Sequence, residues 1–341
     1  MLKIIHSLKN IPFTLFLVLS FQLHAQDIHY SQFGRSPLNI NPALTGLFKG
    51  DVRFIGNYRS QWNKVPVNYM TFSGGVDQKC INSNRKNSLF AAAVYLNHDE
   101  AGDLNLSNTN INLSGSFTRR LATKHYLTAG IQLGGTQRRF DISKLQVDSQ
   151  YDGDGFNASL PTGENTLNAN VFYADLGGGV NYRFQNMDNR MKLDFGAAIF
   201  HANRPDQSFF KNGSQKLEPR WSYYGMTTFG IGKIFDVGLQ AIGQFQGPHL
   251  EILVGGMGKI HLNQERDKEL AVALSLAYRL GDAWVPSLAV DYRMWSVGFS
   301  YDINSSPFNI ASFRRGGPEL SVIYIFSKVR PPKEFEICPL F

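Results

Sequence analysis

The stretch Glu269 to Leu280, ELAVALSLAYRL, decides the fold because it alternates strictly between two kinds of side chain. One set of alternate positions is large and apolar: Leu270, Val272, Leu274, Leu276, Tyr278 and Leu280. The other set is small or polar: Ala271, Ala273, Ser275, Ala277 and Arg279. Successive side chains of a β-strand point to opposite faces, so this segment predicts a strand with one greasy face. Such a strand suits a wall between lipid and a wet or tightly filled interior.

The same period of two recurs along most of the chain. In 191–200, Leu193 and Phe195 alternate with Lys192 and Asp194, and in 294–302 Trp295 and Tyr301 belong to the set that opposes Asp302. Turn-rich breaks separate the segments. We predict strands at 51–59, 68–76, 88–97, 107–118, 125–137, 171–184, 191–200, 221–231, 234–245, 249–260, 269–280, 285–293, 294–302 and 317–326.

The number and spacing of these strands favour an all-β, transmembrane outer-membrane β-barrel of about 14 antiparallel strands. An even number returns both chain ends to the same side of the membrane. If the first strand runs outward, the long breaks 138–170, 201–220 and 303–316 all lie outside and most inner turns are short, as in bacterial outer-membrane barrels. A soluble β-sandwich is the alternative, but its inner face would be apolar and its outer face charged.

The first 25 residues resemble a secretory signal peptide. Lys3 and Lys9 precede the apolar segment Ile11 to Phe21, and cleavage would follow Ala25. Removal of this segment lowers the formal net charge from +7 to +5, since no acidic residue is lost with the two lysines. The remaining excess is spread along the chain rather than clustered, so we expect no binding of nucleic acid.

We divide the chain into a signal peptide (1–25), a periplasmic leader (26–50), the transmembrane barrel (51–326) and a periplasmic C-terminal tail (327–341). The leader contains Pro37, Pro42 and several Asn and lacks strand periodicity, so we expect an extended segment on the periplasmic side or across the barrel mouth. Cys80 and Cys338 would share that side in an oxidising compartment. The sequence leaves open whether they are bonded or free.

Motifs for catalysis or cofactor binding are weak. Asp148, Asp152 and Asp154 fall in VDSQYDGDG, but the spacing fails the EF-hand pattern and favours an ordinary Asp-Gly turn. The triple glycine at 177–179 lies inside a strand, where it favours curvature or close packing rather than phosphate binding. The histidines are scattered, and no G-x-S-x-G occurs. We expect no catalytic residues, no cofactor and no metal.

Several stretches, in order, resemble the PorP/SprF family of Bacteroidetes outer-membrane proteins of the type IX secretion system. They are YSQFGRSPLNINPALTG (Tyr30 to Gly46), NYRSQW (Asn57 to Trp62), TFSGGVD (Thr71 to Asp77), VYLNHDEAGDL (Val94 to Leu104), YRLGDAWVPSLAVDYRMWSVGFSYDIN (Tyr278 to Asn304), GGPELSVIYIF (Gly316 to Phe326) and ICPLF (Ile337 to Phe341). The motif residues that we single out, with a structural or docking role, are Asn41, Pro42, Arg59, Trp62, Tyr301 and Asp302.

The resemblance implies a non-enzymatic accessory protein of type IX secretion. Its partners would be outer-membrane lipid, type IX translocon components and a secreted surface adhesin with a C-terminal sorting domain, as used in gliding motility. It would support export or surface anchoring of that cargo. The main alternative is a passive channel or a hydrophobic-solute porter with a lumen lined by Lys192, Asp194, Asp236, Arg279 and Asp302. The many small inward residues equally suit a narrow lumen plugged by the leader.

Overall fold

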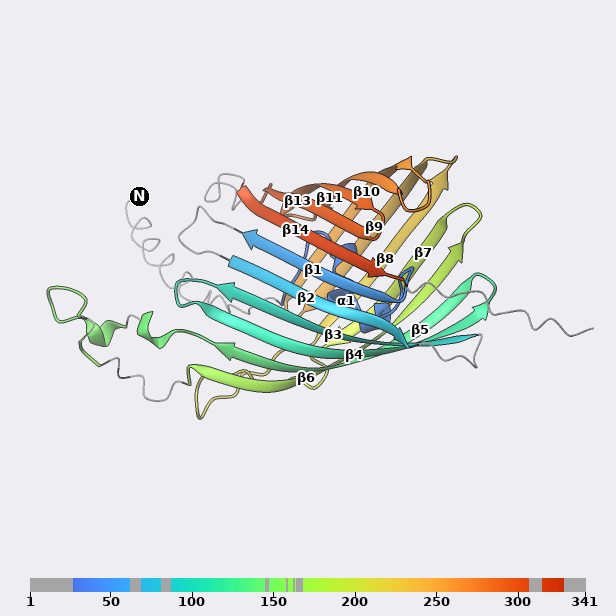
Figure 1. Ribbon diagram of the computed structural model, residues 1–341. Coiled ribbons are helices and arrows are strands. Elements are labelled where there is room, and N and C mark those ends of the chain that lie inside the picture. Colours follow the sequence, from blue (N-terminus) through green and yellow to red (C-terminus); the bar gives the residue numbers. More distant parts are fainter. Residues whose placement is uncertain are drawn as a thin grey trace, which may run out of the picture.

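A computed structural model describes residues 27–61, 69–80, 87–144, 147–157, 159–161, 163, 168–306 and 315–327. Within these residues, fourteen antiparallel strands close into a barrel in chain order, with β1 paired to β14 (Figure 1). The strands are β1 (Val52–Gln61), β2 (Tyr69–Cys80), β3 (Ser88–Ala101), β4 (Leu106–Ala122), β5 (His125–Arg139), β6 (Asn170–Asn186), β7 (Met191–Phe200), β8 (Arg220–Ile231), β9 (Phe235–Gln246), β10 (His249–Asn263), β11 (Leu270–Arg279), β12 (Ala283–Tyr292), β13 (Trp295–Asn304) and β14 (Arg315–Phe326). The predicted barrel and all fourteen predicted strands are confirmed.

The two ends of the barrel differ in the length of their connections. One end, which we call the loop end, carries the connections 140–169, 201–219 and 305–314. The other end, which we call the turn end, carries the short connections 123–124, 187–190, 232–234 and 293–294. Several strands extend beyond their predicted limits, and β2 continues to Cys80 because Asp77 to Cys80 stay paired with β3.

The wall is apolar outside and polar inside, as the alternation predicts. In β11, Leu274 is 65% exposed on the outer surface, whereas Arg279 on the lumen side is 4% exposed. Buried Ser, Asn, Thr and Asp side chains fill the lumen along the other strands as well. Among the described residues, the helices are all too short or too polar to cross a membrane.

The leader occupies the lumen, which is one of the positions that its sequence left open. Residues 27–50 lie inside the barrel, not beside it or across its mouth (Figure 1). This segment starts at the loop end, where the Asp27 backbone N–H donates to Gln246 at the end of β9 (3.1 Å). It then forms η1 (Phe33–Arg35), α1 (Pro37–Ile40) and η2 (Pro42–Leu44) and reaches β1 at the turn end. Polar side chains on the inner wall need partners once they are buried, and the leader supplies them.

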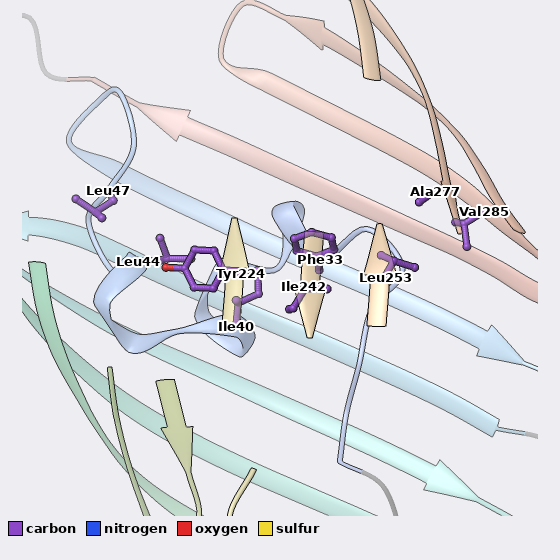
Figure 2. Packing of buried hydrophobic residues seen from close by; sticks show 9 residues of the cluster. All are labelled: Phe33, Ile40, Leu44, Leu47, Tyr224, Ile242, Leu253, Ala277 and Val285. Carbon is purple, nitrogen blue, oxygen red and sulfur yellow. The ribbon is translucent and has the colours of Figure 1, made fainter. Parts of the chain in front are cut away.

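Apolar contacts between the leader and the wall form the core. Phe33, Ile40, Leu44 and Leu47 of the leader cluster with side chains of the far wall, namely Tyr224, Ile242, Leu253, Ala277 and Val285 (Figure 2). On the near wall, Leu38 packs with Ile55, Ala93 and Tyr95. The leader therefore touches both halves of the wall and spans the lumen.

Candidate functional site: the leader in the lumen

The Asn41-Pro42-Ala43 sequence of the leader packs against a pair of glycines in the wall, which we call the glycine seat. Gly130 of β5 and Gly179 of β6 are opposite each other in the sheet. A Cβ atom on Gly179 would lie 2.2 Å from Asn41 Oδ1, and one on Gly130 would lie 2.4 Å from the Ala43 nitrogen. Only glycine therefore allows this approach of the leader to the wall.

Asn41 joins the leader to three strands. Its side-chain amide donates to the carbonyls of Val180 (2.9 Å) and Ala197 (3.2 Å) and faces the Tyr224 hydroxyl at 3.3 Å. Its side-chain oxygen accepts from the Ala43 backbone N–H at 2.8 Å and so caps η2. Asn41 is fully buried, and Pro42 beside it is also buried. The side chain thus satisfies both its donors and its acceptor inside the barrel.

A buried ionic cluster holds the first part of the leader. Arg59 of β1 donates to Asp302 of β13 at 2.7 Å, and Arg279 of β11 reaches the same carboxylate at 3.0 Å. Ser31 of the leader lies among them, because its hydroxyl donates to Asp302 (2.7 Å) and accepts from Arg279 (2.6 Å). Arg59 also donates to the His29 carbonyl at 2.7 Å. The charges are paired and hydrogen-bonded, which is the condition for burying them.

Glu319 of β14 binds the leader backbone through hydrogen bonds. Its two carboxylate oxygens accept from the backbone N–H groups of Ser31 (2.8 Å) and Gln32 (2.9 Å). The Gln32 side-chain amide donates back to the Glu319 carbonyl at 3.1 Å. Recognition of two successive N–H groups by one carboxylate fixes the register of the leader against the wall.

Similar pairs hold the leader near the turn end. Asp77 of β2 accepts from Arg53 (2.7 and 2.9 Å) and from the Gly46 backbone N–H (2.8 Å). Arg183 of β6 pairs with Asp194 of β7 at 2.6 Å and donates to the Leu47 carbonyl at 3.1 Å. Arg53 also donates to the Leu44 carbonyl at 3.3 Å, so each wall pair makes at least one hydrogen bond to the leader backbone.

At the loop end the leader begins with a charged contact. Asp27 Oδ2 lies 3.0 Å from Arg220 Nε and 3.0 Å from His201 Nε2, and His201 Nδ1 lies 2.9 Å from Asp175. Although burial disfavours a charged imidazole, the carboxylates of Asp27 and Asp175 raise the pKa of His201 to about 9. Despite the opposing effect of burial, Arg220 and His201 hold the pKa of Asp27 well below its usual range.

The leader leaves separate spaces within the barrel. A cavity of about 520 Å³ at the loop end is lined in part by Asp27, Ile28 and His29 of the leader. A second cavity, of about 320 Å³, lies between Gly34 and Arg35 of the leader and the strands β7 to β13. Part of its lining, Ala277 and Val285, belongs to the apolar cluster around Phe33.

Four of the singled-out motif residues meet at this site: Asn41 and Pro42 belong to the leader, and Arg59 and Asp302 of the wall bind it. Tyr301 does not join them, because it belongs to the outward set of β13. Trp62 lies outside the described residues. Cys80 is exposed at the turn end of β2. Cys338, like Trp62, lies outside the described residues, so the structure does not test whether the two cysteines are bonded.

The motifs did not single out Ser31, Gly130, Gly179, Arg279 and Glu319 as parts of this site. Arg279 carried a signal, since it is a charged residue on the lumen side of an otherwise small-residue row. Glu319 carried the same signal in β14, because it is a charged residue in the row that also holds Gly317 and Ser321. Gly179 carried a signal too, because a triple glycine inside a strand predicts close packing. Ser31 and Gly130 give no signal, because their importance depends on where the leader lies.

The acidic sequence around Asp152 forms a turn and not a metal site. The described residues contain no group of three or more His, Cys, Asp or Glu arranged to hold an ion. Asp152 accepts from the backbone N–H groups of Asp154 and Gly155, both at 3.1 Å, which is the hydrogen bonding of an Asx turn.

Comparison with solved structures finds barrels of low sequence identity. The monoaromatic hydrocarbon channel CymD is 9% identical, with a TM-score of 0.49, and the match covers 86% of this chain and 94% of CymD. A deltaS2S3 mutant of the monoaromatic hydrocarbon channel TodX is 10% identical with a TM-score of 0.46, and the match covers 84% and 92%. A FadL homologue from Pseudomonas aeruginosa is 11% identical with a TM-score of 0.44, covering 84% and 93%. No curated protein matches this chain.

A protein-family model described as "Type IX secretion system membrane protein PorP/SprF" matches residues 22–324. The match covers the leader, the glycine seat, the ionic cluster and nearly all of the wall. The chain therefore belongs to the PorP/SprF family of type IX secretion system membrane proteins and is a β-barrel of the outer membrane.

Proposed function

We propose that this protein is a non-enzymatic accessory barrel that supports export or surface anchoring of a cognate adhesin-like cargo of type IX secretion. The observation that carries the proposal is the leader that spans the lumen. Glu319 and Asp302 of the wall bind it, and its own Asn41 binds β6, all through buried hydrogen bonds. This arrangement suits a rigid platform better than an open conduit. Membership of a secretion family supports the same role.

In the proposed orientation the loop end faces outward and would receive the cargo. The connections 140–169 and 201–219 are the two longest connections between consecutive strands. Long loops on barrels of this class project from the cell. Phe140 and Phe209 stack edge to face at 4.8 Å, so the two loops support each other. The turn end would then face the periplasm and the translocon.

Deletion of the gene tests this proposal. The cognate adhesin should disappear from the cell surface, whereas other type IX cargo should still be displayed, and a plasmid copy of the wild-type gene should restore the adhesin. Surface labelling followed by mass spectrometry measures both groups of cargo in one experiment. Unchanged display of every type IX cargo in the deletion strain would contradict the proposal.

The alternative function is a passive channel or a hydrophobic-solute porter. The cavity of about 320 Å³ beside Arg35 favours it, because the lining combines charged side chains with Met226, Met257 and Leu288. The leader opposes it, since a solute would have to pass the Phe33 cluster or displace it. Conductance in planar bilayers separates the two functions, because a barrel closed by its leader should carry little steady current.

A further inference from the structure

A pocket at the turn end is lined by cations and by no carboxylate. It has a volume of about 320 Å³ and lies between residues 46–48 of the leader and the strands β2 to β6. Lys79, Arg120 and Arg183 line it, together with the polar side chains of Ser88, Tyr126 and Gln185. Its complete lining consists of described residues and includes neither Asp nor Glu.

Two of these cations lack a counter-charge. Arg183 is paired with Asp194, and that carboxylate also lies 3.2 Å from Lys192. Lys79 donates only to the Phe48 carbonyl (2.5 Å), and Arg120 donates to the carbonyls of Ala122 and Thr123 (both 3.3 Å). Neither has a salt-bridge partner within the described part of the chain.

Two carboxylates outside the lining, Asp51 and Asp77, act on the pocket. Asp51 and Asp77 act on Lys79 electrostatically, but neither is within salt-bridge distance of its ammonium group. Asp77 is fully buried and bound by Arg53 and the Gly46 N–H. The pocket therefore keeps an excess of positive charge.

The Phe48 ring holds one of the unpaired cations in place. The Lys79 ammonium lies 4.8 Å from the ring centroid, and the Arg53 guanidinium lies 4.7 Å from the same centroid. Such cation–π contacts fix the direction of a flexible lysine side chain. Because Phe48 is a leader residue, the pocket exists only while the leader occupies the lumen.

We propose that this pocket binds an oxyanion, either a phosphate or a carboxylate, presented at the turn end of the barrel. The ammonium of Lys79 and the guanidinium of Arg120 supply charge-assisted hydrogen bonds, and Ser88, Tyr126 and Gln185 add further polar groups to the lining. The volume accommodates one such group with its first bound waters. The proposal does not depend on the cargo or on the orientation of the barrel.

Calorimetric titration of the full chain in detergent at low salt tests the proposal. Inorganic phosphate represents a free anion, tetraglutamate represents an acidic polypeptide, and tetralysine is the negative control. Binding of either anion supports the site, and tighter binding of tetraglutamate identifies the source as an acidic protein segment. Lys79→Met and Arg120→Gln should each weaken binding by about tenfold or more.

Arg119→Gln is the matched control. Arg119 is one residue from Arg120 on the same strand, is exposed, and belongs to the opposite face of β4. Its substitution therefore removes the same charge outside the pocket. Its effect should stay within about twofold, because a distant surface charge is screened. Failure of both phosphate and tetraglutamate to bind would overturn the proposal. Equal weakening by Arg119→Gln and Arg120→Gln would overturn it as well, since the attraction would then be a property of the whole surface.

Discussion

At the scale of single residues, the ionic cluster around Asp302 is the point where the leader depends most on the wall. Arg59 and Asp302 come from motifs far apart in the sequence, and both are about 2% exposed as side chains. Arg59→Met removes one partner and leaves Asp302 and Glu319 short of a buried cation. We expect a loss of about 3–5 kcal/mol in the free energy of unfolding, measured by denaturant titration of the protein in lipid vesicles.

Tyr301→Phe provides the control for this substitution. Tyr301 is adjacent to Asp302 but faces outward, so the change should cost no more than about 0.5 kcal/mol. If Arg59→Met were as mild as Tyr301→Phe, the buried pair would have no role in holding the fold together.

The glycine seat makes a second prediction at this scale. Gly179→Ala introduces a Cβ 2.2 Å from Asn41 Oδ1, so either the leader or the wall has to shift. Gly178→Ala on the neighbouring outward position meets only the Gly130 carbonyl at an ordinary 3.5 Å. We expect a loss of about 1–3 kcal/mol for the first change and a small effect for the second, with thermal unfolding as the measurement. A reversed order would contradict the seating of Asn41 on Gly179.

At the scale of elements, β11 tests the assignment of the two faces. Leu274→Arg places a charge on the lipid-facing surface, at a cost of about 2–4 kcal/mol near the membrane midplane. Ser275→Arg directs the same side chain toward the cavity that Ser275 lines with Ser287, so its cost should be clearly lower. Refolding yield and unfolding free energy measure both variants. Equal losses would contradict the assignment of the two faces.

The leader's first contact makes a prediction for pH. The pKa of His201 is raised from 6.5 to about 9 in the folded protein, so its contribution to stability is fully present below pH 6.5 and is lost as the pH rises through 9. Asp27, Asp175 and Arg220 are the charged groups that face it, and the low pKa of Asp27 keeps that carboxylate ionised throughout this window. Hydrogen exchange of residues 27–32, corrected for intrinsic rates, should therefore show less protection at pH 10 than at pH 7.

His201→Gln is the control for this pH effect. Glutamine can still hydrogen-bond to Asp27 but does not titrate, so the extra loss of protection between pH 7 and pH 10 should vanish. The same dependence in the variant would assign the effect to another group.

The wall could be predicted from the sequence because its signal is local. Residues such as Leu274 and Ser275 show their faces by alternation alone, and this pattern gave all fourteen strands. A lumen plugged by the leader was one open reading, but the contacts of the leader could not be predicted, because its partners are distant. Ser31 binds Glu319 across 288 positions, and Asn41 binds Ala197 across 156. No period in residues 26–50 reveals those partners. The family motifs did mark Asn41, Arg59 and Asp302, but they did not show that the three meet the same segment.

At the scale of the whole molecule, the leader decides whether the barrel conducts. It contacts both halves of the wall, through Leu38 on β1 and β3 and through Phe33 on the opposite side. Wild-type protein in planar bilayers should therefore show little steady current. Deletion of residues 27–47 should open the lumen, whose buried polar side chains would then be hydrated, and should raise the single-channel conductance severalfold.

The deletion variant must first be shown to fold, by its heat-dependent mobility on gels, before its current is compared with that of the wild type. A variant that leaves the leader seated, Leu274→Val on the outer surface, should remain as silent as the wild type. A large steady current through the wild-type protein would favour the passive channel instead, because a leader held by Glu319, Asp302 and Asn41 leaves no continuous path of that size. These contacts lie on strands β1, β6, β7, β11, β13 and β14, so the loss of contacts to one strand does not release the leader. A wild-type protein without current and a deletion variant that conducts would together identify the leader as the element that closes the barrel.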